Sequence, residues 1–381
     1  MSKLIKIGAY IKDIINPKRL YISNYFKTDF KKKVLISYIT RPFIAGIDVG
    51  HSNSIESFEV VKIFHNLGYQ VDIVQYGAKI ESIKFKNSQY DIVFGLEPNF
   101  LKAIEKFRPK KTIYYATGAH YSFQNKAEND RLLDLKKRKG VLLEQRRFVF
   151  PHESSIIADA VICFGNKWTM STYENKCKRI EPVRTSAYTF FSFNEIQDKK
   201  NRTEARNNFM CLASAGAVHK GLDILLDIFK KHPDIHLYIC GDIKKEKDFF
   251  DLYNKELLHT SNIHYMGWTS PDSEEFKKIA TKCAFSILPS CSEGMNGAIP
   301  TCMQLGLIPL VSEECGLDIE SCGIIFEKNL IEFIEGIILD CSQKSDSWLR
   351  RKSFDSYQFA KNNNTMKAFS KDFKIALNKI L

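Results

Sequence analysis

The segment "LASAGAVHKGLDILL", Leu212–Leu226, has the residue types that hold an anion at the end of a strand. A strand-like run ends in small residues, among them Ser214 and Gly216, and Lys220 precedes a helical pattern. Small residues let backbone N–H groups approach an anion, a helix start adds positive potential, and a lysine adds a full charge. The pattern suits a diphosphate site, or a plain strand–turn–helix with a solvated lysine. It contains neither GxGxxG nor GxxxxGK[ST], which argues against a nicotinamide or Walker-type site.

A second segment, "AFSILPSCSEGMNGAIP" (Ala284–Pro300), places a single carboxylate, Glu293, in a loop of small residues. The run Ala284–Ser290 has the length and composition of a buried parallel strand, so Glu293 should emerge at the carboxyl edge of a sheet. Residues Gly294–Gly297 then offer backbone N–H groups at the start of a helix. A carboxylate beside such donors can accept sugar hydroxyls while the donors hold an anionic leaving group. The alternative is an acid that caps its own helix.

The chain contains two successive regions in which strands and helices alternate. The strands of these regions must position the two loops. The alternation predicts an α/β protein with two doubly wound, mostly parallel sheets, whose ligands bind at the carboxyl ends of the strands, in a cleft between the domains. A helix is expected from about Ser54 to Leu67. The predicted strands are Lys33–Ile39, Gln70–Tyr76, Tyr90–Gly95, Lys111–Thr117 and Asp159–Gly165 in the first half, and Phe209–Ser214, Ile235–Asp242, Asn262–Trp268, Ala284–Ser290 and Leu307–Ser312 in the second.

The domain boundaries follow from the same pattern. We expect a basic amphipathic segment at 1–32, a Rossmann-like domain at 33–184, a polar hinge at 185–208, a second Rossmann-like domain at 209–350, and C-terminal helices at 351–381 that pack back across the cleft. The charged stretch Lys126–Arg147 is interpreted as a solvated helical excursion whose basic face could also meet an anionic substrate.

The composition, with 44% hydrophobic and 26% charged residues in 381, is that of a globular protein. No apolar run approaches the roughly 18–20 residues needed to cross a bilayer, and the N-terminus lacks the apolar core of a signal peptide. We therefore expect a cytoplasmic protein. Its ten cysteines form no CxxC pair and no cluster with metal spacing, so they should be reduced and mostly buried.

The net charge of +12 is concentrated in residues 1–33, where lysines and arginines alternate with aliphatic and aromatic side chains. This pattern is typical of a helix that lies on an anionic membrane face, or of a solvated helix packed on the domain. No nucleic-acid module is recognisable, so a nucleic acid is the least favoured partner.

Five motifs occur in the order SxGxxxKG, LxIxGD, NIxxxGW, LPSxSEG and GLIPLVSxxxG between Phe209 and Gly316. This set resembles the C-terminal, donor-binding domain of retaining GT-B glycosyltransferases of the group 1 type, which use nucleotide sugars. The first half is similar to the acceptor domain of such enzymes in its overall rhythm, and "ATGAHYSFQN" followed by "ADAVICFGN" fits.

The resemblance implies roles for particular residues. Glu293 would contact the hydroxyls of the donor sugar, Lys220 would neutralise the leaving diphosphate, and His120 would lie near the transferred sugar. Glu293 and His120 are thus the implied catalytic residues, and the implied donor-binding residues are Lys220, Ser214, Gly216, Gly294, Met295, Asn296, Gly297 and Thr301.

The sequence departs from the family pattern in two places. Thr301 stands where the second acid of the Glu-x7-Glu motif belongs, so no carboxylate reaches the ribose from there. An arginine that often precedes the lysine is replaced by Ala215 and Gly216, and Arg41 or Arg184 could supply a substitute charge.

A further loop could line the cleft. In "DVGHSNS" (Asp48–Ser54), His51 and Asn53 could touch the donor phosphates or the acceptor, or form a turn and a helix start.

The mechanism implied is transfer with retention of anomeric configuration, in which the departing phosphate takes the acceptor proton and no metal is needed. The expected acceptor is a glycan or lipid-linked saccharide at the inner face of the plasma membrane, in polysaccharide or lipopolysaccharide synthesis. Two rival interpretations remain: an epimerase-like GT-B enzyme, and an inactive GT-B scaffold that binds a membrane partner through residues 1–33.

Overall fold

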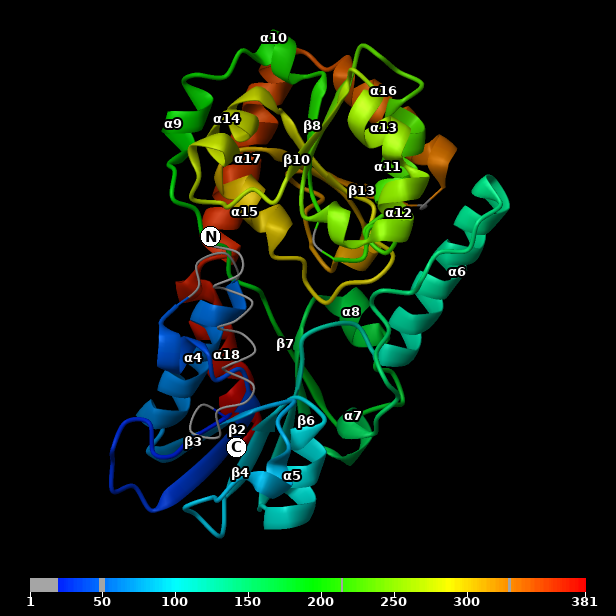
Figure 1. The fold of residues 1–381 in the computed structure, drawn as a ribbon. Coiled ribbons are helices and arrows are strands. Elements are labelled where there is room, and N and C mark those ends of the chain that lie inside the picture. Colours follow the sequence, from blue (N-terminus) through cyan, green and yellow to red (C-terminus); the bar gives the residue numbers. More distant parts are fainter. Residues whose placement is uncertain (1–19, 48–51, 214, 328–329) are drawn as a thin grey trace.

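Two mostly parallel β-sheets, each flanked by helices, make up the two halves of the chain in the computed structural model, which describes residues 20–47, 52–213, 215–327 and 330–381 (Figure 1). The first sheet has the strand order β1-β3-β2-β4-β5-β6-β7, and only β1 runs antiparallel to its neighbour. Its strands are β1 (Tyr21–Ile22), β2 (Lys32–Tyr38), β3 (Tyr69–Gln75), β4 (Ile92–Gly95), β5 (Lys111–Ala116), β6 (Ala160–Phe164) and β7 (Ile180–Val183).

The second sheet is entirely parallel, with the order β10-β9-β8-β11-β12-β13. The chain starts in the middle, at β8, builds outward to β10, and then returns to the other side of β8 with β11. The loops after β8 and β11 therefore flank the point where the strand order reverses, which is where doubly wound sheets bind ligands. The strands are β8 (Asn208–Leu212), β9 (His236–Cys240), β10 (Ile263–Gly267), β11 (Phe285–Leu288), β12 (Ile308–Ser312) and β13 (Ile324–Phe326).

Helices cover both sheets. Those of the first half are α3 (Pro42–Ala45), α4 (Ser52–Asn66), α5 (Asn99–Phe107), α6 (Tyr121–Lys139), α7 (Ser154–Ile157) and α8 (Lys167–Ser171). Two short helices follow in the sequence between β7 and β8. They are α9 (Phe193–Gln197) and α10 (Arg202–Ala205). The remaining helices are α11 (Leu222–Phe229), α12 (Lys247–Leu252), α13 (Asn254–His259), α14 (Glu274–Lys282), α15 (Ala298–Gln304), α16 (Ile331–Ser342), α17 (Asp346–Asn363) and α18 (Met366–Ile380).

All ten predicted strands are present with shifts of a few residues at their ends, and three strands were not predicted. These three, β1, β7 and β13, lie at sheet edges and have two to four residues each. Strands this short carry no readable alternation, and β7 contains Pro182, which is tolerated at an edge because its missing N–H faces away from the ladder.

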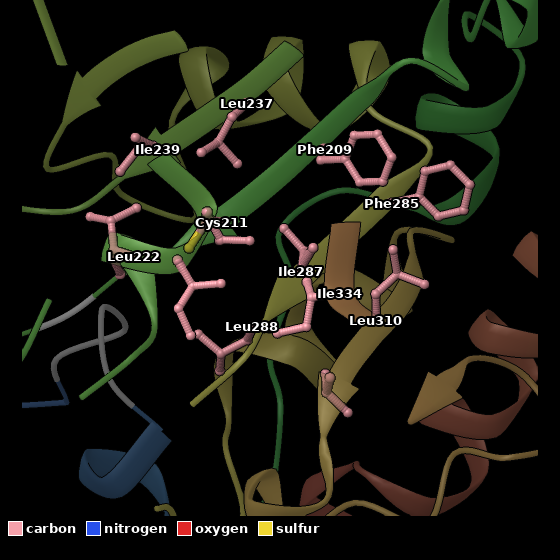
Figure 2. Close-up of a cluster of buried hydrophobic side chains, with 14 of the residues drawn as sticks. Phe209, Cys211, Leu222, Leu237, Ile239, Phe285, Ile287, Leu288, Leu310 and Ile334 are labelled. Atoms are coloured by element: carbon pink, nitrogen blue, oxygen red, sulfur yellow. The ribbon is translucent and has the colours of Figure 1, made fainter. Parts of the chain in front are cut away.

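The core of the second half is centred on β8 and β11 (Figure 2). Phe209 and Phe285 lie side by side on the two strands, with ring centroids 4.9 Å apart, and Ile287 and Leu310 extend this layer. These side chains are buried, and packing of this kind fixes the height and direction at which the strands end. The loops that carry Lys220 and Glu293 thus project from a rigid base.

Helix α6 links the two halves. It begins beside the first sheet and extends along α11 and α12 of the second (Figure 1). Arg138 binds Asp223 and Asp227 of α11, and Lys139 binds Asp227. Every residue of α11 is buried, including Asp223 and Asp227. The interpretation of Lys126–Arg147 as a solvated excursion is therefore wrong for this end of the helix, because its cations neutralise acids that α11 buries.

The C-terminal helices also join the halves. In α17, Leu349 and Ala360 pack into the core of the second half, whereas Phe369 and Phe373 of α18 pack against the first sheet. The termini of the described chain thus both lie on the first half (Figure 1).

The described part of the basic N-terminal segment is not helical beyond its first residue. Tyr21 belongs to β1, and Tyr25 and Phe26 pack on the first core. The prediction of a helix is therefore wrong from Tyr21 onward. This stretch instead forms a short strand and a loop whose apolar side chains pack on the first half of the chain. Residues 1–19 lie outside the described part of the chain. Within the described ranges, the helices are all too short or too polar to span a membrane.

We expect Arg138→Gln to lower the free energy of unfolding by about 3–5 kcal/mol, because it removes the ion-pair partner of the fully buried Asp223. Chemical denaturation at pH 7 measures this loss. Lys126→Gln is the matched control on the same helix, since Lys126 pairs with Asp130 at the surface, and should cost less than about 1 kcal/mol. Equal costs for the two substitutions would contradict a role for Arg138 in joining the halves.

Candidate functional site

Lys220 and Glu293 form an ion pair where the loops after β8 and β11 meet. Lys220 lies in the turn that leads into α11, and Glu293 follows β11. Their side chains are 5% and 10% exposed, so both charges are withdrawn from water. Ser290 donates a hydrogen bond of 2.8 Å from Oγ to the same carboxylate oxygen that Lys220 binds. The two predicted loops therefore converge on one charged pair.

Glu293 is ionised at neutral pH. Burial alone would raise the pKa of Glu293, but the Lys220 ammonium and weaker charges outweigh it and lower that pKa to about 2. The neighbouring His219 donates from Nε2 to the carbonyl of Ser292. Burial lowers the pKa of His219 to about 3, so this ring is neutral at pH 7. Its Nδ1 and the Ser292 hydroxyl are buried and have no hydrogen-bond partner among the described residues.

The loop after Glu293 is packed against the first half of the chain. The carbonyl of Glu293 accepts from the N–H of Ala119 (3.1 Å), and that of Gly294 accepts from the Thr169 hydroxyl (2.7 Å). A side chain at position 294 would come within 2.9 Å of the Gly118 Cα, so only glycine allows this approach. The site therefore lies where the two halves meet.

Three N–H groups of this loop are available to an acceptor. Within the described residues, the backbone N–H groups of Gly294, Met295 and Gly297 donate no hydrogen bond. Asn296 differs, because its N–H donates to the Cys315 carbonyl (3.1 Å) and its side-chain oxygen caps α15 by accepting from Ala298 and Ile299. Unpaired donors beside a buried ammonium favour an anion.

The loop after β8 is occupied by a carboxylate of the protein itself. Both oxygens of the buried Glu246 accept from the backbone, one from Gly216 and the other, at 3.0 Å, from Ala217. In this structure the Gly216 N–H is already used by Glu246, so a diphosphate would reach that donor only by displacing the carboxylate, and the role of Gly216 in donor binding stays a prediction. Sequence reasoning missed Glu246, which follows β9 and gives no local signal of its destination.

The remaining predicted residues have varied surroundings. The Met295 side chain packs between the cores of both halves, and its sulfur accepts from the N–H of Thr185 at 3.2 Å. The Thr301 hydroxyl donates to the Gly297 carbonyl (3.0 Å) in its own helix. Asn53 hydrogen-bonds the Tyr38 hydroxyl. Ser214 and His51 lie outside the described residues.

Neither predicted substitute arginine reaches the ion pair in the described structure. Arg184 binds Asp372 through Nε (2.6 Å) and Nη2 (2.9 Å), so its charge is used to hold α18 on the first half. Arg41 is exposed at the start of α3. Because Arg184 is paired with Asp372, the structure gives no support to its predicted role as a substitute charge.

His120 caps the start of α6 next to the site. Its Nδ1 accepts from the N–H of Ser122 (3.3 Å), so the neutral ring carries its proton on Nε2, which is buried and has no partner among the described residues. Burial, with a smaller contribution from Lys176, lowers the pKa of His120 to about 4. Its ring packs on Tyr173 of the first half, and within the described residues it does not touch Lys220 or Glu293.

The described residues hold no group of three or more His, Cys, Asp or Glu side chains placed to bind a metal ion. The ten cysteines are all free, and nine are buried, as predicted.

The comparisons with known proteins bear on the family and the fold of the chain. Residues 206–339 match the model of the family described as Glycosyl transferases group 1. Among curated proteins, none matches the chain in sequence.

Solved structures match nearly the whole chain. HepE from Anabaena, in complex with UDP and glucose, has 11% identity and a TM-score of 0.59, with 91% of this chain and 99% of that one covered. Sucrose-phosphate synthase from Thermosynechococcus elongatus has 13% identity and a TM-score of 0.60, covering 92% and 99%. WaaG, a glycosyltransferase involved in lipopolysaccharide biosynthesis, has 13% identity and a TM-score of 0.53, covering 90% and 98%. These similarities confirm the predicted GT-B fold.

We expect Lys220→Met to cost about 3–5 kcal/mol of stability at pH 7, because Glu293 is then left buried and unpaired. In the wild type the folded pKa of about 2 lies below the unfolded value, so the contribution of Glu293 is present above about pH 4.3 and is lost towards pH 2. In Lys220→Met the largest opposing charge is lost, and burial then raises the folded pKa above the unfolded one. The variant should therefore regain stability relative to the wild type as the pH falls from 7 to 5.

Urea denaturation at both pH values measures this effect. The double variant Lys220→Met with Glu293→Gln is the control, since it should recover most of the loss and show no regain on acidification. A small cost that is independent of pH in Lys220→Met would mean that the pair is not buried.

Proposed function

Because residues 206–339 belong to the group 1 glycosyltransferases, we propose that this chain transfers a sugar from a nucleoside diphosphate sugar to a glycan or lipid-linked acceptor, with retention of anomeric configuration. The observation that carries the proposal is the buried Lys220–Glu293 pair beside the unpaired N–H groups of Gly294, Met295 and Gly297. This arrangement offers a cation and N–H donors for phosphate, and a carboxylate for sugar hydroxyls.

The roles follow from the charges. Lys220 stabilises the negative charge that develops on the diphosphate as the bond from the sugar to the diphosphate breaks. The N–H groups of Gly294 and Gly297 add hydrogen bonds to the same charge. Glu293, held ionised, can accept hydrogen bonds from donor-sugar hydroxyls but has no proton to give at neutral pH. The acceptor hydroxyl then attacks from the side on which the diphosphate departs, and a phosphate oxygen takes its proton.

His120 is assigned to the sugar as a neutral hydrogen-bond donor. Its lowered pKa of about 4 keeps the ring uncharged at pH 7, and its Nε2–H has no protein acceptor among the described residues. We propose no metal for the reaction, because Lys220 supplies the cation at the leaving group.

The first donors to test are UDP-sugars, since HepE has been crystallised with UDP and with UDP-glucose. WaaG acts in lipopolysaccharide biosynthesis, and this parallel supports a cell-surface glycan as the acceptor. The basic N-terminal segment would bring the enzyme to an anionic membrane face.

Calorimetric titration with UDP, GDP, ADP, CMP and dTDP, together with a transfer assay, tests the proposal. We expect one nucleotide to bind. Glu293→Gln, whose amide oxygen can still accept from Lys220, should bind it within about threefold of the wild type, but transfer should fall by at least about 100-fold.

The contribution of Lys220 is measured in the Glu293→Gln background, where no buried carboxylate is left unpaired. Adding Lys220→Met should weaken nucleotide binding by about 10- to 100-fold, the effect of losing a charge-assisted hydrogen bond. Lys126→Met, at the surface of α6, should change neither property. If no nucleotide binds at millimolar concentration, the inactive scaffold replaces the enzyme as the better account.

The stereochemistry is tested separately. We expect the anomeric carbon of the product, followed by proton NMR, to keep the configuration of the donor sugar. An inverted product would contradict attack from the leaving-group side, while leaving the donor site itself intact.

A further inference from the structure

The loop that follows α6 is held against that helix by three of its side chains. The Glu128 carboxylate accepts from the N–H groups of Arg146 and Arg147, at 3.0–3.1 Å. Gln124 donates to the carbonyl of Arg147 at 2.6 Å, and Asn125 exchanges two hydrogen bonds with Val149. Both the N–H and the carbonyl of Arg147 are therefore hydrogen-bonded to side chains of α6.

The side chain of Arg147 crosses from the first half of the chain to the donor loops of the second. A Cβ atom at position 216 would lie 2.7 Å from the Cγ of Arg147 and 3.1 Å from the Cβ of His219. The glycine at 216 thus makes room for the arginine. The charge of Arg147 also acts on Glu293, where it helps to lower the pKa after the larger effects of burial, Lys220 and His219.

The guanidinium of Arg147 forms no hydrogen bond or ion pair with any residue that the structure describes. Its neighbour Arg146 has two carboxylate partners, Glu144 and Asp248. The two adjacent arginines therefore differ: Arg146 is paired with carboxylates of both halves, whereas Arg147 lies over Gly216 with its donors unused.

We propose that Arg147 binds the diphosphate of the donor and so supplies the cation that the loop after β8 lacks. This inference rests on the proposed function. Glu246 occupies the N–H groups of Gly216 and Ala217, so this loop carries a carboxylate where an anion would need positive charge. Arg147, lying over Gly216, restores that charge, and its planar fork of donors matches phosphate oxygens.

The anion site is then assembled from both halves, with Lys220 from the second and Arg147 from the first. Its ligand class is a diphosphate, free or esterified to a nucleoside. Because α6 holds both Arg147 and, through Arg138, the buried acids of α11, the same helix that joins the halves also completes the site.

Titration of the full chain with inorganic diphosphate and with the five nucleotides named above tests the assignment. Arg147→Gln should weaken binding of both kinds of ligand by about 10- to 100-fold. Arg147→Lys should recover part of this loss, since it keeps the charge but not the fork. Lys126→Gln, which removes a surface cation of α6, is the control and should stay within about twofold of the wild type. Thermal melts of each variant verify folding.

The outcomes separate this inference from the proposed function. If a nucleotide binds the wild type and Arg147→Gln equally well, the proposed function stands and the role of Arg147 is wrong. If inorganic diphosphate binds in an Arg147-dependent way but no nucleotide binds, the anion site stands and the nucleotide-sugar donor is wrong. If the wild type binds neither, both are overturned.

Discussion

The buried ion pair between Lys220 and Glu293 is the constraint on which the site depends. Withdrawing two charges from water is unfavourable unless each is the partner of the other and their remaining hydrogen-bonding capacity is met. Ser290 meets part of it for the carboxylate. The rest of the surroundings remains incomplete, with orphaned polar atoms on His219 and Ser292 and unpaired N–H groups of Gly294, Met295 and Gly297 among the described residues. An incomplete polar shell around a buried pair is what a polar ligand would complete.

Topology explains why these two residues meet. The strands β8 and β11 are neighbours in space but are separated in sequence by two further strands, because the sheet is built outward from β8 and then resumed on its other side. The loops that leave these two parallel strands therefore lie side by side at the carboxyl edge of the sheet, where doubly wound sheets bind ligands. Aromatic packing of Phe209 on Phe285 fixes the two strands relative to each other, and so sets the distance between the loops.

The rest of the proposed site comes from the first half of the chain, where that half contacts the second. Helix α6 carries cations toward the buried acids of α11 and holds the loop of Arg147 against itself with Gln124, Asn125 and Glu128. A change in how the halves are oriented would therefore alter the diphosphate site directly. On this account, domain contact and donor binding are coupled through one helix.

The sequence was informative where a pattern is local. Alternation and apolar runs predicted the strands of both sheets, and the small-residue loops around Lys220 and Glu293 were identified from their own composition. Contacts between distant segments were not predictable in this way. Nothing near Glu246 indicates that it caps Gly216, and Arg147 lies in a run of charges that resembles a solvated helix. Arg184 is a further example, since its charge is neutralised by Asp372 from the far end of the chain.

The most direct measurement is a crystal structure of the chain with the nucleoside diphosphate that binds it. The account predicts phosphate oxygens within hydrogen-bond distance of Lys220 Nζ, the guanidinium of Arg147 and the N–H groups of Gly294, Met295 and Gly297. A nucleotide bound elsewhere, with the Lys220–Glu293 pair still closed and untouched, would contradict it.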